Sequence, residues 1–339
     1  MRPLLLLVSS LWLACSSPPA GPPVNHDSQP DQPAGDGPAV APDLSLPDGA
    51  PDLSPIPGCT GFSKLSGTLS LTVSHGGLKR TAWISIPSSY DATRPVGVVL
   101  NFHGYSSNAT QQSLYSGMGS AAPAAGLVAV HPEGTGVVQS WNAGPCCGEA
   151  ATFKVDDVGF VGALLDLVAT KICVDPRQVF ATGISNGGFM SYRLACALSD
   201  RIAAIAPVAG ALLTSPCTPK RPVPTFHFHG TKDTLVPYGG NLLLGWPGAE
   251  DSVKRMAANN GCTGSSQQFH QQGDVTCVRW EASACSQGAE VRLCTVDGGG
   301  HTWPGGFDVP IPWIGYQTQD ISATDEILAF FKSHPMPKP

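Results

Sequence analysis

Hydrophobic and polar positions change pattern near residue 60, and from there on they predict strands and helices in alternation. Residues 68–73 and 81–86 alternate apolar and polar side chains, which predicts an antiparallel hairpin. Residues 97–102 and 127–130 are unbroken apolar runs that end in His-Gly and His-Pro. Runs of this length are typical of parallel strands buried on both faces.

The alternation continues to the end of the chain. Residues 109–125 can form a helix, and residues 157–172 carry apolar side chains at helical spacing. Further helices are expected over 186–198 and 323–331, and further strands over 178–182, 203–208, 225–228 and 290–296. This order predicts an α/β fold with a mostly parallel central sheet and helices on both faces. Ligands of such sheets bind beyond the carboxyl ends of the strands.

The N-terminus has a different composition. A positive Arg2 and the short apolar run 4–13 predict a signal peptide over 1–15, because the run is too short to span a bilayer. Leu13-Ala14-Cys15 resembles a bacterial lipobox, although Trp12 stands where such boxes have Leu or Val. We therefore expect lipidation of Cys15, with an ordinary signal peptide cut a few residues later as the alternative.

Residues 16–58 are dominated by Pro, Asp, Gly, Ser and Ala. Such a segment cannot bury enough apolar area to offset its ordering entropy, so it is expected to be a disordered tether. The catalytic domain is then expected over 59–339. The localisation that follows is extracellular or the cell envelope, with an outer-membrane lipoprotein as one form.

Charge and cysteine content narrow the partners. The 339 residues carry a net charge of −6 and no basic block, which argues against nucleic acid as a partner. Contact with a membrane is expected only through the lipid anchor.

Ten cysteines besides Cys15 favour disulfides in an exported chain, whereas a zinc site is disfavoured because no CxxC pair exists. No metal or cofactor is expected. Four cysteines are expected to pair among themselves: Cys262, Cys277, Cys285 and Cys294. The adjacent Cys146 and Cys147 either reach distant partners or bridge each other.

The pentapeptide Gly183-Ile184-Ser185-Asn186-Gly187 carries the first chemical signal. It follows a predicted strand and precedes a predicted helix, which is the setting of a nucleophile elbow. Ser185 is the candidate nucleophile, and the backbone N–H of Asn186 is a candidate oxyanion donor at the start of the helix. The alternative is a glycine-rich turn with a capping serine.

A serine nucleophile needs a base, and a base needs an orienting acid. Of nine histidines, His301 lies in a glycine run after the last predicted strand. Asp233 follows the strand 225–228, between serine and histidine in the order typical of α/β-hydrolases. The competing acids are Asp200, Asp251 and Asp297.

The second oxyanion donor is expected from the loop that follows an earlier strand. His103-Gly104-Tyr105 is that loop, and the backbone N–H of Tyr105 is the candidate. A plain turn is the alternative.

Several stretches together resemble the polyhydroxybutyrate depolymerase-like esterases, a group that overlaps with the feruloyl and acetyl-xylan esterases of carbohydrate esterase family one. These stretches are VDDVGFV (155–161), VDPRQVFATGISNGGFMSYRLAC (174–196), IAPVAG (205–210), HGTKDTLVPY (229–238) and GGGHTWPGG (298–306). The resemblance implies an α/β-hydrolase fold, a covalent acyl-enzyme, no metal, and Ser185, Asp233 and His301 as the triad. It also implies a place near the acyl pocket for Trp141, within SWNAGPCCG. Trp141 and Trp303 are the candidates for stacking on the substrate, with core packing as the alternative.

The function expected is an exported serine ester hydrolase that releases feruloyl or acetyl groups from plant cell-wall polysaccharide. Three alternatives remain open: a polyester depolymerase, a serine peptidase or acyltransferase with the same triad, and an inactive carbohydrate-binding surface protein. The segment 262–294 is expected to be a disulfide-stapled lid or insertion.

Overall fold

The computed structural model describes residues 44–45, 58–308 and 311–338. The expected signal peptide, Cys15 and nearly all of the expected tether lie outside these residues. Two residues within the expected tether form strand β1 (Leu44–Ser45), which pairs in parallel with β2 (Gly67–His75).

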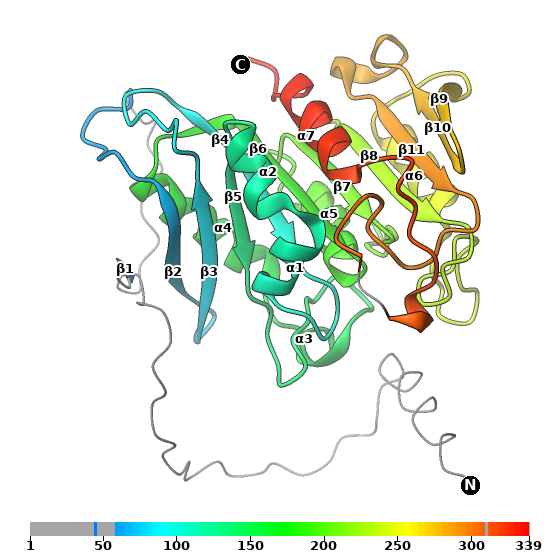
Figure 1. Cartoon of the computed structure of the whole chain (residues 1–339), viewed down its shortest axis with the longest axis horizontal. Helices are drawn as coiled ribbons and strands as arrows, with labels where there is room; N and C mark the ends of the chain where they lie inside the picture. The colour runs from blue at the N-terminus through cyan, green and yellow to red at the C-terminus, as the bar shows by residue number, and fades with distance from the viewer. Residues whose placement is uncertain (1–43, 46–57, 309–310, 339) are drawn as a thin grey trace, which may run out of the picture.

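The described residues form one sheet of eleven strands in the order β1-β2-β3-β5-β4-β6-β7-β8-β11-β10-β9 (Figure 1). The strands after β2 are β3 (Leu78–Ile86), β4 (Val96–Phe102), β5 (Val128–Pro132), β6 (Val174–Ile184), β7 (Ala204–Val208), β8 (Thr225–Gly230), β9 (Gln267–Gln272), β10 (Val275–Trp280) and β11 (Val291–Val296). From β5 to β11 in this order the neighbours are parallel. The pairs β2–β3, β3–β5, β11–β10 and β10–β9 are antiparallel. The predicted architecture is confirmed.

Helices cover both faces of this sheet (Figure 1). One face carries α1 (Ala109–Ser116), α2 (Met118–Ala124) and α7 (Ala323–Ser333), and the other carries α4 (Asp157–Lys171), α5 (Asn186–Ala197) and α6 (Ala249–Asn259). Shorter helices are α3 (Gly148–Thr152), η2 (Ala282–Ala284), η3 (Ser286–Gly288) and η4 (Pro312–Ile314). Each face has its own hydrophobic core. Within the described part of the chain, every helix is too short or too polar to cross a bilayer.

The prediction of one helix over 109–125 is wrong. The chain forms α1 and α2 instead, because Gly117 between them has φ 68° and so leaves the helical region. The N–H of Gly117 caps the first helix on the carbonyl of Leu114 (3.1 Å), and the Asn108 side chain caps its start.

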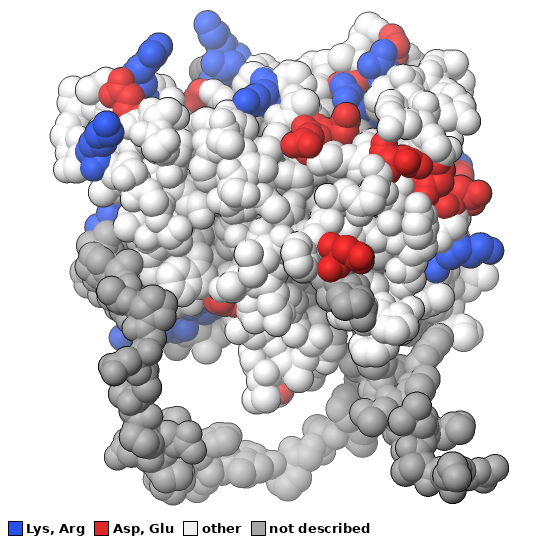
Figure 2. Space-filling view, viewed as in Figure 1, with Lys and Arg blue, Asp and Glu red and all other residues white. Residues whose placement is uncertain are grey.

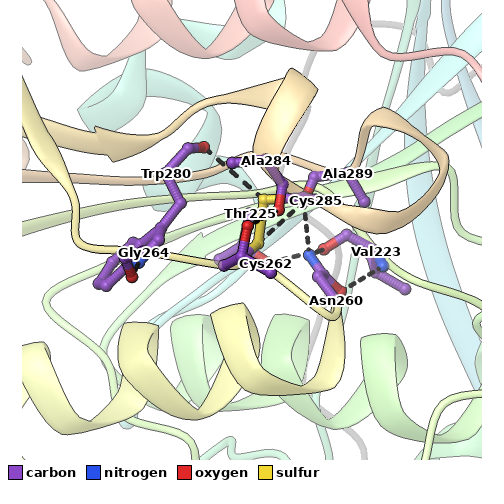
Figure 3. Close-up of a disulfide and its surroundings, with 10 residues drawn as sticks. Val223, Thr225, Asn260, Cys262, Gly264, Trp280, Ala284, Cys285 and Ala289 are labelled. Atoms are coloured by element: carbon purple, nitrogen blue, oxygen red, sulfur yellow. Dashed lines mark hydrogen bonds between the residues drawn. A yellow bond between two sulfur atoms is a disulfide. The ribbon is translucent and has the colours of Figure 1, made fainter.

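The C-terminal cysteines pair as expected, Cys262 with Cys285 and Cys277 with Cys294. Beside the first bridge, the buried Asn260 amide accepts from the N–H of Val223 (2.8 Å) and donates to its carbonyl (Figure 3). The segment 262–294 is therefore not a lid: it adds the hairpin β9–β10 and strand β11 to the sheet.

The other disulfides join Cys59 to Cys173, Cys196 to Cys217, and Cys146 to its neighbour Cys147. The vicinal bridge is thus the alternative adopted by the adjacent pair. All ten cysteines of the described residues are paired, which is typical of proteins that fold in an oxidising compartment outside the cytosol.

Candidate active site

Ser185 stands on a sharp turn between β6 and α5. Its backbone has φ 58° and ψ −123°, a conformation that costs a non-glycine residue energy and needs support from its surroundings. The N–H of Ser185 donates to the carbonyl of Val208 (2.9 Å). A Cβ at Gly183 or Gly187 would lie 2.4 or 2.2 Å from the carbonyl oxygen of Phe102. A side chain at either position would therefore collide with this carbonyl, so both positions require glycine. The turn presents a partly exposed Ser185 at the edge of the sheet.

Asn186 has a buried side chain that fixes the neighbouring loop. Its amide accepts from the N–H of Trp141 (2.7 Å) and donates to the Trp141 carbonyl (3.0 Å). The indole of Trp141 in turn donates to the carbonyl of His103 (2.9 Å). The backbone N–H of Asn186 is in the first turn of α5, where no intrahelical acceptor is available.

The loop with Tyr105 lies directly beside the nucleophile. A Cβ on Gly104 would be 3.4 Å from the Cβ of Ser185. The loop is shaped by His103, whose Nε2 accepts from the N–H of Gly134 (2.9 Å) while Nδ1 donates to the Gly104 carbonyl (2.8 Å). Burial lowers the pKa of His103 to about 4, so this imidazole stays neutral and keeps the acceptor.

A buried ion pair supports the same side of the site. Arg80 donates to Asp157 (2.6 Å), and the second oxygen of this carboxylate accepts from the N–H of Asn142 (2.7 Å). Burial raises the pKa of Asp157, and the charge of Arg80 opposes this effect. The guanidinium also lies over the rings of Trp141 and Phe160. The ion pair thus joins three elements at one point: the hairpin β2–β3, the helix α4 and the loop 133–147.

Asp233 and His301 meet at the carboxyl ends of the adjacent parallel strands β8 and β11. Nδ1 of His301 donates to Asp233 Oδ2 (2.7 Å), which leaves Nε2 as the basic nitrogen. Oδ1 of Asp233 accepts from the N–H groups of Leu235 (2.9 Å) and Val236 (2.8 Å). Burial alone would raise the pKa of Asp233, but the neighbouring His301 and His229 hold it well below its usual range.

The glycine run before His301 is held rather than flexible. The N–H of Gly300 donates to the Tyr316 carbonyl (2.8 Å), and the N–H of His301 donates to the Ile314 carbonyl (2.5 Å). Two of the competing acids have other partners: Asp200 pairs with Lys220, and Asp297 accepts from Thr231.

Ser185 lies at the same edge as this pair, because β6, β7, β8 and β11 are successive parallel neighbours. The hydrogen bonds of the described residues do not include one between the Ser185 hydroxyl and His301. Catalytic hydrogen bonds are often long in unliganded enzymes and tighten with substrate.

The prediction that Trp141 and Trp303 stack on the substrate is wrong in this structure. Both side chains are fully buried. Trp303 donates its indole N–H to Thr324 (2.9 Å), as Trp141 does to a backbone carbonyl. With their N–H groups satisfied inside the protein and no ring face open, both are packing residues.

Exposed apolar side chains instead occur on the loops at the carboxyl edge. Leu242 and Leu243 are 99 and 98% exposed, at the tip of the turn 241–246 that follows Asp233. Trp313 is 66% exposed and sits in η4, next to the residue that holds the backbone of His301. We name these three residues the apolar rim. Figure 2 shows few charged side chains along the lower edge, where the active-site loops of Figure 1 lie. In the sequence, the signal for Leu242 and Leu243 is the run of three leucines at 242–244 among glycines.

Among the described residues, no cluster of His, Cys, Asp and Glu is arranged to hold a metal ion.

Comparison with known proteins decides the family. No family model matches the chain. The chain is 36% identical over 236 residues to feruloyl esterase B of Piromyces equi, covering 66% of this chain but only 42% of that protein. It is 30% identical over 216 residues to feruloyl esterase C of Emericella nidulans, covering 64% of this chain and 74% of that protein. The chain belongs to the feruloyl esterase-like α/β-hydrolases, which are carboxylic ester hydrolases.

Other relatives agree with this assignment. The putative esterase NocK of Nocardia uniformis is 30% identical over 260 residues, which cover 70% of this chain and 74% of that protein. Among solved structures, an acetyl xylan esterase from Aspergillus awamori aligns with a TM-score of 0.53 at 15% identity, covering 75% of this chain and 94% of that one. At this identity the structural match supports the fold of this α/β-hydrolase and nothing finer.

The elbow geometry of this feruloyl esterase-like chain leads to a stability prediction. We expect Gly183→Ala to destabilise the protein by about 3 kcal/mol or more, because its Cβ would overlap the Phe102 carbonyl. Gly239→Ala is the matched control, since it has open space around it and an ordinary φ. Urea denaturation of both variants measures the difference, and equal midpoints would contradict the steric argument.

Proposed function

We propose that this chain is an exported serine esterase that hydrolyses feruloyl or acetyl esters of plant cell-wall polysaccharide. The observation that carries the proposal is the Asp233–His301 pair, at the same sheet edge as a serine held in a strained turn. The names of the relatives support the substrate class.

The proposed reaction has two acyl-transfer steps. Nε2 of His301 takes the proton of the Ser185 hydroxyl as its oxygen attacks the ester carbonyl carbon. The backbone N–H groups of Tyr105 and Asn186 hold the developing oxyanion, each contributing about 2.7–4 kcal/mol in the transition state. The imidazolium then protonates the leaving alcohol. Water attacks the acyl-enzyme with His301 again acting as base, which releases the acid and restores the serine.

Asp233 has a defined part in this cycle. Its depressed pKa means that the carboxylate stays ionised down to strongly acidic pH, so it can stabilise the imidazolium throughout the working range. The loss of activity on acidification is therefore not expected to follow protonation of Asp233.

Replacing the nucleophile tests the proposal. We expect Ser185→Ala to lower kcat for p-nitrophenyl acetate by a factor of about 10⁴ or more, since base and acid have nothing to activate. Far-UV circular dichroism is expected to stay unchanged. Wild-type activity in a folded Ser185→Ala protein would refute the assignment.

The apolar rim is the proposed contact surface for the acyl group of the substrate. We expect Trp313→Ala to raise KM for methyl ferulate about 3- to 10-fold and to leave KM for an acetyl ester unchanged, because only the aromatic acyl group offers a ring to stack. Trp83→Ala, at an exposed tryptophan on β3, is the control. An equal effect on both esters would argue against an aromatic site.

A polyester depolymerase is the second candidate, favoured by the exposed pair Leu242 and Leu243. These side chains suit adsorption to an apolar solid. Faster turnover of hydroxybutyrate oligomers than of methyl ferulate would select this candidate over the first.

Export and lipidation are part of the proposal. The five disulfides of the described residues support an oxidising destination. In a bacterial host we expect the full chain to incorporate labelled palmitate and Cys15→Ser not to do so. Unlabelled wild-type protein in the medium would instead indicate an ordinary signal peptide.

A further inference from the structure

A line of buried polar side chains runs behind the acid of the triad. The hydroxyl of Tyr192 in α5 lies 2.6 Å from Nδ1 of His227 in β8. Nε2 of His227 lies 2.9 Å from Nδ1 of His229, two residues further along the same face of the strand. Nε2 of His229 lies 2.8 Å from the carbonyl oxygen of Val236 and 3.4 Å from Asp233 Oδ2. All three side chains of the line are almost fully buried.

When both imidazoles are neutral, the direction of every hydrogen bond in this line is fixed by its last acceptor. A carbonyl oxygen cannot donate, so His229 must carry its proton on Nε2. Its Nδ1 then accepts, which requires the proton of His227 on Nε2. Nδ1 of His227 accepts in turn from the hydroxyl of Tyr192. One arrangement of protons therefore satisfies each group.

Burial disfavours the charged forms of two members of the line. It lowers the pKa of His227 well below its usual value, with His229 adding to the effect, and it raises the pKa of Tyr192. Other titratable groups that face the line or Asp233 are Tyr238, whose ring meets that of His229 edge-on, Tyr115 of α1, and His301.

The line joins the two elements that carry the catalytic groups. Tyr192 lies two turns beyond Ser185 on α5, and His229 stands at the end of the strand that precedes Asp233. The Val236 N–H group binds one oxygen of Asp233 while the carbonyl of the same residue binds His229. Any change at Tyr192 can thus reach the carboxylate through contacts alone.

We propose that Tyr192, His227 and His229 are positioning residues, which hold the Asp233 carboxylate in the orientation that serves His301. The assignment rests on the proposed esterase function for its catalytic consequence. A carboxylate that loses this support points less well at the imidazolium, so both the rate and its dependence on pH change.

Tyr192→Phe removes the first donor of the line and is the principal test. We expect kcat for p-nitrophenyl acetate to fall about five-fold with KM unchanged. The acidic limb of kcat/KM is expected to move to lower pH, because a misaligned carboxylate stabilises the imidazolium less. Tyr90→Phe is the matched control: Tyr90 is also buried, and its hydroxyl accepts from the N–H of Cys173, far along the chain from the triad.

His227 allows a rescue experiment. Gln at this position can accept from Tyr192 and donate to His229, whereas Leu can do neither. We expect His227→Leu to reproduce or exceed the effect of Tyr192→Phe, and His227→Gln to recover most of kcat and the wild-type pH profile. Thermal denaturation of each variant separates a loss of folding from a loss of positioning.

The outcomes distinguish this proposal from the function on which it rests. If Tyr192→Phe and Tyr90→Phe both lower thermal stability but leave kcat and the acidic limb unchanged, the line is structural and the proposal fails. If the wild-type protein hydrolyses no ester, the proposed function fails first. Nitrogen-15 NMR of the imidazoles reports where their protons lie and needs no measurement of enzymatic activity. We expect protons on Nε2 of both His227 and His229. An Nδ1 proton on either ring would contradict the proposed hydrogen-bond line.

Discussion

The left-handed backbone of Ser185 is the constraint on which the rest of the structure depends. It reverses the chain between β6 and α5 in one residue, and only glycine fits on either side, at positions 183 and 187, because the Phe102 carbonyl fills the space. Farther along, Gly188 packs against the backbone of β7, where a Cβ would lie 2.9 Å from the Val208 carbonyl. The helix is therefore pressed onto the strand ends, which sets the depth of the nucleophile relative to its neighbours.

Two buried polar networks connect this turn to the elements around it. On one side Asn186 holds Trp141, whose indole holds the loop with His103 and Tyr105. On the other side Tyr192 leads through two histidines to Asp233. Buried polar groups are costly unless every partner is present, so each network tolerates one arrangement and disfavours the rest. The site is held in place by hydrogen bonds that satisfy its buried polar groups, rather than by charges at the surface.

The features that could be predicted from the sequence are those set by residues close together in the chain. Strands β4 and β5 were predicted because burial on both faces leaves an unbroken apolar run, and the elbow was predicted because its glycines are neighbours in the chain. The break at Gly117 was missed, because the sequence does not show whether an isolated glycine inside a helical pattern has a positive φ.

What the sequence could not predict depends on contacts between remote segments. The burial of Trp303 requires Thr324 as acceptor, and the burial of Trp141 requires a carbonyl 38 residues away. His227 and His229 did carry a signal, because a spacing of two places both on one face of a strand. Their partner on α5 became visible only when the helix was packed on the sheet.

The buried networks and the exposed rim are under different physical constraints. Asp233 and His301 are held by each other and by backbone groups of neighbouring segments, not by the side chains of the rim. Leu242 and Leu243 project almost entirely into solvent, and replacing them disturbs no internal contact. Substitutions at such positions alter which surface the enzyme meets at little cost in stability. The side chains at positions 242 and 243 can therefore vary without disturbing the strand ends that hold Asp233 and His301.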